Sequence, residues 1–294
     1  MRAAMTSARN PTRLPAATTN QAPDVRIDVS QMVATMRNDI ALENMRTTTT
    51  DQLGRSSSRS SAIAAGMVVG ATAPSTNLNL SMRSIAEVFP NRLCGVLRTE
   101  NADAGFQACL TAMEAGVHTI EITKTVPSCF DMIKGLIATT MGRYPVGVGT
   151  VWDPGAVKEA KQAGASFVVT PVLLPEVADA CRQEDILCVL GALTPTEIYQ
   201  ARLAGAALVK VFPITPVGGP RYIQSLNGPL GGVPFWVSGG VPIEDVGAYL
   251  RLGVKAVGLT NALFPPEALA RRDMDQISQY AERAARAAAE AIGD

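Results

Sequence analysis

From about Leu80 onward, short apolar runs alternate with helical segments, and this alternation constrains the fold more than any other feature of the 294-residue chain. Such alternation is typical of βαβ units that build a parallel sheet. Eight apolar runs are predicted strands: Leu93–Leu97, His118–Thr123, Val146–Val148, Phe167–Thr170, Leu187–Leu190, Ala207–Phe212, Phe235–Val237 and Ala256–Leu259. The predicted helices between them are Ala102–Ala115, Cys129–Thr139, Pro154–Ala163, Pro175–Glu184, Pro195–Ala204, Pro220–Leu226 and Ile243–Leu252.

Several of these helices end in a glycine that directly precedes the next strand, at Gly116, Gly164, Gly205 and Gly253. Glycine reaches the left-handed conformation of a helix C-cap at little cost. The repeat predicts an α/β fold, a compact (β/α)₈ TIM barrel over residues 81–294. Ser81–Phe89 is expected to form a lid helix, and Pro266–Ile292 a terminal amphipathic helix. Strand count alone leaves an open doubly wound sheet as the alternative.

Residues 1–80 differ in composition from the barrel. The first 61 residues hold eight Arg, no Lys and five acidic residues, together with Ser/Thr tracts that have almost nothing to bury. An Arg-rich, Ser/Thr-rich and initially acid-free leader is typical of an organelle transit peptide. We therefore expect a disordered targeting extension, with the plastid stroma favoured over the mitochondrial matrix; an ordinary disordered tail is the alternative.

Charge, apolar run length and residue types exclude several function classes. The formal net charge of zero argues against nucleic-acid binding, and no apolar run is long enough for a membrane span. Five Cys without a C-x-x-C pair and a single His, His118, argue against a zinc cage, a Ser-His-Asp triad or a disulfide framework. No metal site is predicted.

One lysine and one glutamate are candidates for catalysis. Lys210 interrupts an apolar run near the end of the sixth predicted strand, where a charged ammonium is costly to bury and a neutral amine is a nucleophile. By the period of two in a strand, Glu121 is expected to face the barrel interior with Thr123 and Thr125, while Lys124 faces the helices. An amine and a carboxylate in one pocket suit Schiff-base chemistry. The alternatives are a Lys210 that reaches out between helices and a structural ion pair with Glu121.

Glycine pairs and hydroxyls follow the last three predicted strands. These are Gly218-Gly219, then Ser238-Gly239-Gly240, then Gly258 with Thr260. Loops after strands seven and eight commonly bind phosphate in this fold, because their backbone N–H groups are exposed. The three clusters therefore predict a phosphate site.

These segments together resemble the class I pyruvate aldolases typified by 2-keto-3-deoxy-6-phosphogluconate (KDPG) aldolase and 4-hydroxy-2-oxoglutarate (KHG) aldolase. The resemblance covers about residues 81–264, and Lys210-Val211-Phe212-Pro213 with its trailing Gly218-Gly219 is its most specific element; the other matching segments are Ile120–Thr123, Val146–Val151, Phe167–Pro171, Leu193–Glu197, Ser238–Gly240 and Val257–Thr260.

The resemblance implies roles for individual residues. Lys210 corresponds to the Schiff-base lysine and Glu121 to the general acid/base. Thr150, Pro171, Phe212 and Ser238 are implied to contact the keto acid, and Gly218, Gly219, Gly239, Gly240 and Thr260 the phosphate. It implies no cofactor, because the lysine imine is the electron sink, and a homotrimer as the assembly. The implied reaction cleaves KDPG to pyruvate and glyceraldehyde 3-phosphate.

The chain also departs from the family pattern. Many members place an arginine for the pyruvate carboxylate where this chain has Thr125, and Arg98, at the end of the first strand, is the nearest replacement. Val172 and Trp236-Val237 also differ, and we expect them to narrow the mouth of the site. A non-catalytic barrel kept as a binding or assembly subunit is the alternative function, and a thiamine-phosphate or indole-glycerol phosphate type of enzyme is a third.

Overall fold

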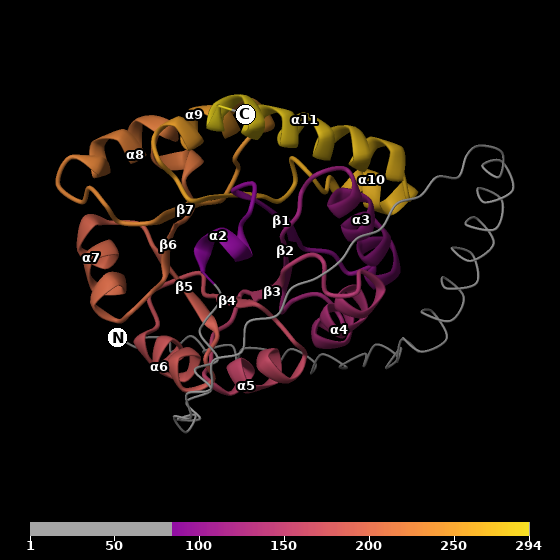
Figure 1. Ribbon diagram of the computed structural model, residues 1–294, viewed down its shortest axis with the longest axis horizontal. Coiled ribbons are helices and arrows are strands. Elements are labelled where there is room, and N and C mark those ends of the chain that lie inside the picture. Colours follow the sequence, from indigo (N-terminus) through magenta and orange to yellow (C-terminus); the bar gives the residue numbers. More distant parts are fainter. Residues whose placement is uncertain (1–83, 294) are drawn as a thin grey trace, which may run out of the picture.

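The computed structural model describes residues 84–293, and in it eight parallel strands close into a barrel. Each strand pairs with the next along the chain, and β1 pairs with β8 (Figure 1). Closure confirms the (β/α)₈ barrel and removes the open-sheet alternative. The strands are β1 (Leu93–Leu97), β2 (Ile120–Thr123), β3 (Val146–Gly149), β4 (Phe167–Val169), β5 (Leu187–Ala192), β6 (Leu208–Val211), β7 (Phe235–Val237) and β8 (Ala256–Leu259).

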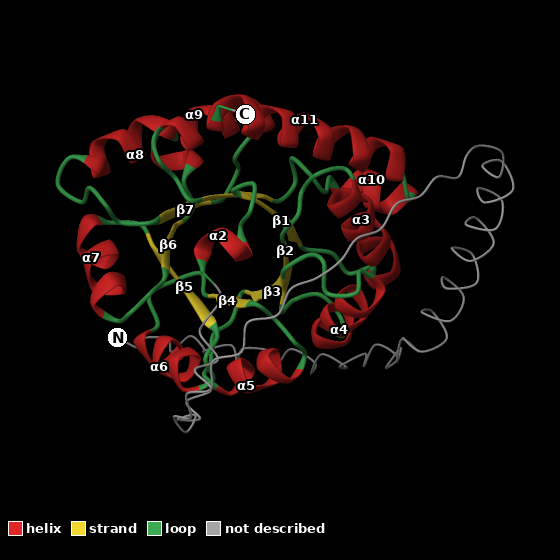
Figure 2. Ribbon diagram, in the orientation of Figure 1, coloured by secondary structure: helices red, strands yellow, loops and turns green. Residues whose placement is uncertain are grey.

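Helices form an outer ring around the strands (Figure 2). They are α3 (Ala102–Glu114), α4 (Cys129–Thr139), α5 (Gly155–Gln162), α6 (Pro175–Gln183), α7 (Pro195–Leu203), α8 (Pro220–Asn227), α9 (Val246–Arg251), α10 (Pro266–Arg271) and α11 (Met274–Ile292), with short 3₁₀ turns η1 (Thr215–Val217) and η2 (Ile243–Asp245). Four of the connections from a helix to the next strand pass through the predicted glycines, which have φ between 83° and 107°. Side chains with a Cβ rarely adopt this conformation, so glycine ends these helices.

The start of α7 shows how local sequence fixes a helix end. Thr194 accepts a hydrogen bond from the Glu197 N–H, and the Glu197 carboxylate accepts from the N–H groups of Leu193 and Thr194 at 2.9 and 2.7 Å. These backbone donors lower the pKa of Glu197. Pro195 occupies the first helical turn, where no N–H is needed.

Two apolar layers lie on either side of the strands. The larger one fills the space between strands and helices, and the smaller one fills the barrel lumen. The lumen layer comes from alternate strand residues: Cys94, Val96, Phe167, Val169, Leu187, Val189, Leu208, Trp236 and Ala256. Since strand side chains alternate with period two, the same alternation directs Glu121 and Lys210 inward.

The predicted N-terminal lid helix is α2, and within the described residues it covers only Ile85–Val88. Thr119, just before β2, donates a hydrogen bond to the Val88 carbonyl at 2.6 Å, and Phe89 packs on Phe167 at the start of β4. The helix therefore closes the amino-terminal opening of the barrel, where Figure 1 shows it inside the ring of strands. It is not a lid over the carboxyl ends of the strands.

The predicted terminal helix is broken in two. Arg272 has φ 54° and ends α10, and the Asp273 side chain accepts from the Gln276 N–H to begin α11. Asp273 is an N-cap residue within the predicted amphipathic segment, so a new helix begins there.

The predicted targeting extension, residues 1–80, lies outside the described residues. Among residues 84–293, no helix is long and apolar enough to cross a membrane, and no cluster of His, Cys, Asp or Glu could hold a metal.

Candidate active site

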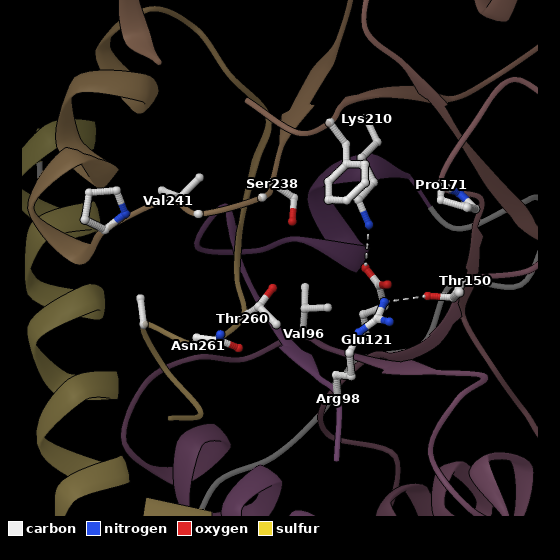
Figure 3. Close-up of a pocket in the computed structure, with 15 residues that line it drawn as sticks. Val96, Arg98, Glu121, Thr150, Pro171, Lys210, Ser238, Val241, Thr260 and Asn261 are labelled. Carbon is white, nitrogen blue, oxygen red and sulfur yellow. Dashed lines mark hydrogen bonds and ion pairs between the residues drawn. The ribbon is translucent and has the colours of Figure 1, made fainter. Parts of the chain in front are cut away.

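Lys210 and Glu121 meet inside the barrel. Lys210 comes from β6 and Glu121 from β2, and the Lys210 Nζ lies 3.4 Å from the Glu121 Oε2 (Figure 3). Their side chains are 8% and 1% exposed, so both charged groups are held away from bulk water. Lys210 thus points into the lumen and does not reach out between helices. The two residues also form the ion pair that the sequence analysis left as an alternative. Both line an open cavity, so a bound molecule could reach them.

Glycine at position 149 makes room for the carboxylate. A Cβ built on Gly149 would lie 1.7 Å from the Glu121 Oε1 and 2.3 Å from its Cδ. Oε1 is buried and accepts no hydrogen bond from any described residue, whereas Oε2 faces Lys210. The carboxylate therefore lies against the backbone of β3 at Gly149, and its other oxygen faces Lys210.

Replacing Gly149 by alanine is expected to displace the Glu121 carboxylate. The shift needed is above an ångström, and misplacement of a catalytic group on that scale costs about 10²-fold in activity. Steady-state kinetics of Gly149→Ala measures the loss. Gly228→Ala is the matched control, because the nearest atom to its Cβ would be 3.8 Å away, an ordinary contact. Full activity in Gly149→Ala would contradict the placement of Glu121 at the reacting centre.

A cavity of about 650 Å³ opens at the carboxyl ends of the strands. That is the end where (β/α)₈ barrels carry their active sites. Ten of the thirteen predicted site residues line it: Arg98, Glu121, Thr150, Pro171, Lys210, Phe212, Ser238, Gly239, Gly240 and Thr260. Figure 3 shows Ser238, Val241, Thr260 and Asn261 on one side of it, and Thr150 and Pro171 on the other.

Thr125 does not line the cavity, so the structure does not bring it together with the other predicted substrate-binding residues. Strand β2 ends at Thr123, and beyond that residue the alternation of faces no longer applies. The Thr125 hydroxyl lies 2.8 Å from that of Thr123, which donates to the Leu97 carbonyl. Its neighbour Lys124 pairs with Asp153 at 3.2 Å and lowers the pKa of that carboxyl, so it too is directed away from the cavity.

Gly218 and Gly219 also lie outside the cavity lining, so the structure does not bring them together with the other predicted phosphate-binding residues. Their N–H groups donate within the η1 turn, from Gly218 to the Thr215 carbonyl and from Gly219 to the Ile214 carbonyl, both at 3.2 Å. An amide that is already bonded is a poor anion donor. A glycine pair in sequence does not reveal whether its amides are free.

The loops after β7 and β8 remain as the candidate phosphate site. Gly239 and Gly240 have φ of 95° and 81°, and their N–H groups make no hydrogen bond with any part of the chain that the structure describes. Thr260 adds a hydroxyl, and Asn261 and Ala262 complete this side of the cavity. Asn261 was missed by the sequence reasoning, although its position next to Thr260 in the same loop could have indicated it. Free N–H groups and polar side chains in one cavity suit an oxyanion.

Arg98 carries the second positive charge of the cavity lining, after Lys210. Its Nη2 donates to the Thr150 Oγ1 at 3.2 Å, and Figure 3 draws this contact as a dashed line. Thr150 has φ 59°, a strained conformation for a β-branched residue, and such strain clusters at functional sites. The guanidinium is thereby held at the mouth, where it can bind a carboxylate.

Val172 and Trp236, which were expected to narrow the mouth of the site, lie in different places. Val172 is 42% exposed and stands outside the cavity lining, whereas Trp236 is completely buried in the lumen. The expectation that Trp236 narrows the mouth is therefore wrong. Its ring lies beside the Lys210 side chain instead, with the ring centroid 5.3 Å from Nζ.

Residues 85–280 match the family described as "KDPG and KHG aldolase". The 2-dehydro-3-deoxy-phosphogluconate aldolase of Dickeya dadantii (strain 3937) is 32% identical over 170 residues, 58% of this chain and 79% of that protein. The 2-dehydro-3-deoxy-6-phosphogalactonate aldolase of Escherichia coli (strain K12) is 26% identical over 189 residues, 64% of this chain and 92% of that protein. A solved structure described as "Native KDPGal structure" is 26% identical, covers 68% of this chain and 95% of its own, and has a TM-score of 0.62.

Proposed function

The chain belongs to the KDPG and KHG aldolase family of carbon–carbon lyases, and from this premise we propose that it cleaves KDPG to pyruvate and glyceraldehyde 3-phosphate through an imine on Lys210. The observation that carries the proposal is the buried contact between Lys210 and Glu121 at a cavity whose opposite side offers free N–H groups. A structural ion pair alone would not need the cavity that both residues line.

The reaction uses the two residues in sequence. The neutral Lys210 amine attacks the C2 keto carbon, and the resulting carbinolamine loses water to give a protonated imine. A base then removes the proton from the C4 hydroxyl, the C3–C4 bond breaks, and its electron pair moves into the imine to form an enamine. Protonation of C3 and hydrolysis of the imine release pyruvate and restore Lys210. Glu121 accepts and returns these protons, directly or through a water molecule.

The two ends of the cavity bind the two ends of the substrate in this proposal. Arg98, held by Thr150, pairs with the carboxylate next to the keto carbon. The N–H groups of Gly239 and Gly240, with Thr260 and Asn261, bind the phosphate. This arrangement replaces the arginine that many family members carry at the position of Thr125.

Replacing Arg98 by alanine is expected to raise the KM for the keto acid by about 10- to 100-fold and to change kcat much less. A hydrogen bond to a charged group contributes about 1.5–3 kcal/mol, and the carboxylate is bound in the ground state and transition state alike. Initial-rate kinetics measures both constants. Arg143→Ala is the control, because Arg143 precedes β3 at the opposite end of the barrel. An unchanged KM in Arg98→Ala would place the carboxylate elsewhere.

Borohydride trapping tests the proposed mechanism. Incubation with pyruvate and sodium borohydride should attach a reduced pyruvate adduct to Lys210, found by peptide mass mapping. An adduct on another lysine, or none, would overturn the imine mechanism whatever the fold. Absence of turnover with every keto acid, together with a stoichiometric partner, would favour the alternative of a non-catalytic barrel.

A second substrate is favoured by a specific observation. The relative that this chain covers over 92% of its length is a phosphogalactonate aldolase, whose substrate differs from KDPG in the configuration at C4. Both compounds give the same products, so kcat/KM should be compared for the two epimers and for KHG, which has no phosphate.

The homotrimer and the organelle location stay predictions, which sedimentation analysis and localisation of a tagged full-length protein would test.

A further inference from the structure

We propose that Trp236 is a positioning residue for Lys210, which holds the reactive nitrogen at the cavity and stabilises positive charge on it. The inference rests on the proposed imine at Lys210. Trp236 lies beside Lys210 in the β6–β7 register, and its ring centroid is 5.3 Å from the Lys210 Nζ. Trp236 has no exposed surface and does not line the cavity, so it approaches Lys210 from within the lumen.

The surroundings of the nitrogen show why the indole matters. The Lys210 Nζ has one carboxylate partner, Glu121. It lies 5.3 Å from the centroid of the Trp236 ring and 5.5 Å from the centroid of the Phe212 ring. Aromatic faces attract cations, indole most strongly, and the attraction grows when water is excluded. The ammonium before the reaction and the protonated imine during it place a positive charge on the same nitrogen. The indole therefore stabilises the protonated imine relative to a site without an aromatic face.

A tryptophan is a costly choice for packing alone at this position. Its Nε1 is buried and has no hydrogen-bond partner among residues 84–293. A phenylalanine would avoid that cost, because an unpaired buried N–H loses free energy. The indole also requires glycine at position 258, where a Cβ would lie 2.6 Å from Nε1. The indole thus leaves a buried N–H unpaired and requires glycine at position 258. Both features favour a role for the aromatic face of Trp236 beyond packing.

The ring is held from the far end of the barrel. Phe89, next to α2, contacts Trp236 edge-on with a centroid distance of 5.2 Å, and Phe167 does so at 5.9 Å. These rings belong to the lumen layer and pack against the indole, which limits its movement. The residue that follows the closing helix at the amino-terminal mouth therefore contacts the indole that lies beside Lys210.

Trapping as a function of pyruvate concentration tests the inference with Trp236→Leu and Trp236→Phe in the full chain. Loss of the aromatic face in Trp236→Leu should raise the half-saturating pyruvate concentration for the borohydride adduct by about tenfold, whereas Trp236→Phe should stay within about threefold of the original protein. Both changes shrink the side chain, so a packing role alone predicts similar values in the two variants. Equal half-saturation in all three proteins would overturn the inference.

Fluorescence supplies a readout that does not alter Trp236. The chain has two tryptophans, and Trp152 is 57% exposed and outside the cavity lining, so Trp152→Phe leaves Trp236 as the sole indole reporter. Its emission should change on addition of pyruvate with the half-saturation found by trapping. An emission that stays constant while the adduct forms would overturn the inference. Failure of the original protein to form any adduct would instead overturn the proposed imine mechanism, so the two failures are distinguishable.

Discussion

Replacing Lys210 by arginine is expected to lower kcat/KM by about 10⁴-fold or more while the protein stays folded. A guanidinium preserves the positive charge opposite Glu121, so the buried carboxylate keeps a partner. It cannot form an imine with a keto carbon, because it is not a neutral amine at any working pH. Steady-state kinetics and thermal unfolding together separate loss of the nucleophile from loss of the fold.

Lys134→Arg is the matched control for this substitution. Lys134 lies on α4, its side chain is 55% exposed, and it makes only an exposed contact with Asp131. The control should keep full activity and form the pyruvate adduct. Activity of Lys210→Arg within tenfold of the original chain would show that cleavage does not pass through Lys210.

The eight strands could be predicted because parallel strands in a barrel are buried on both faces. Such strands appear as continuous apolar runs, and every residue of β1, β5 and β6 is indeed buried. Against that background Lys210 is conspicuous, since it is a charged residue within a run whose neighbours Val209 and Val211 are fully buried. The period of two then placed Glu121 correctly, because it lies within β2.

The structure departs from the expected placement where local pattern does not determine geometry. Thr125 lies beyond the end of β2, so the alternation that placed Glu121 did not apply to it. Gly218 and Gly219 look like Gly239 and Gly240 in sequence, but η1 uses the amides of the first pair and leaves those of the second free. The position of Trp236 depends on Phe89, Phe167 and Gly258, which come from three other parts of the chain. Only the folded structure brings these residues together.

Replacing Glu121 by glutamine is expected to lower kcat by about 10²- to 10⁴-fold, the range for loss of a general acid/base. Glutamine has nearly the same shape and fits above Gly149, but its amide does not accept a proton from the C4 hydroxyl or return one to C3. Glu121 is the only carboxylate among the cavity-lining residues of the described chain, so no other side chain can replace it there. Kinetics with KDPG measures the loss.

Solvent exchange separates this role from that of an ion-pair partner. In deuterated water the original protein should exchange the methyl hydrogens of pyruvate through the enamine, and NMR follows the loss of the methyl signal. Glu121→Gln should slow this exchange by a factor similar to its loss in kcat. The rate is corrected for the folded fraction, because Lys210 loses its carboxylate partner in this variant. Glu244→Gln is the control, because Glu244 is exposed, pairs with Arg283 and is not among the residues that line the cavity. Exchange at the original rate in Glu121→Gln would reduce Glu121 to a structural partner of Lys210 and require the proton to travel through water alone.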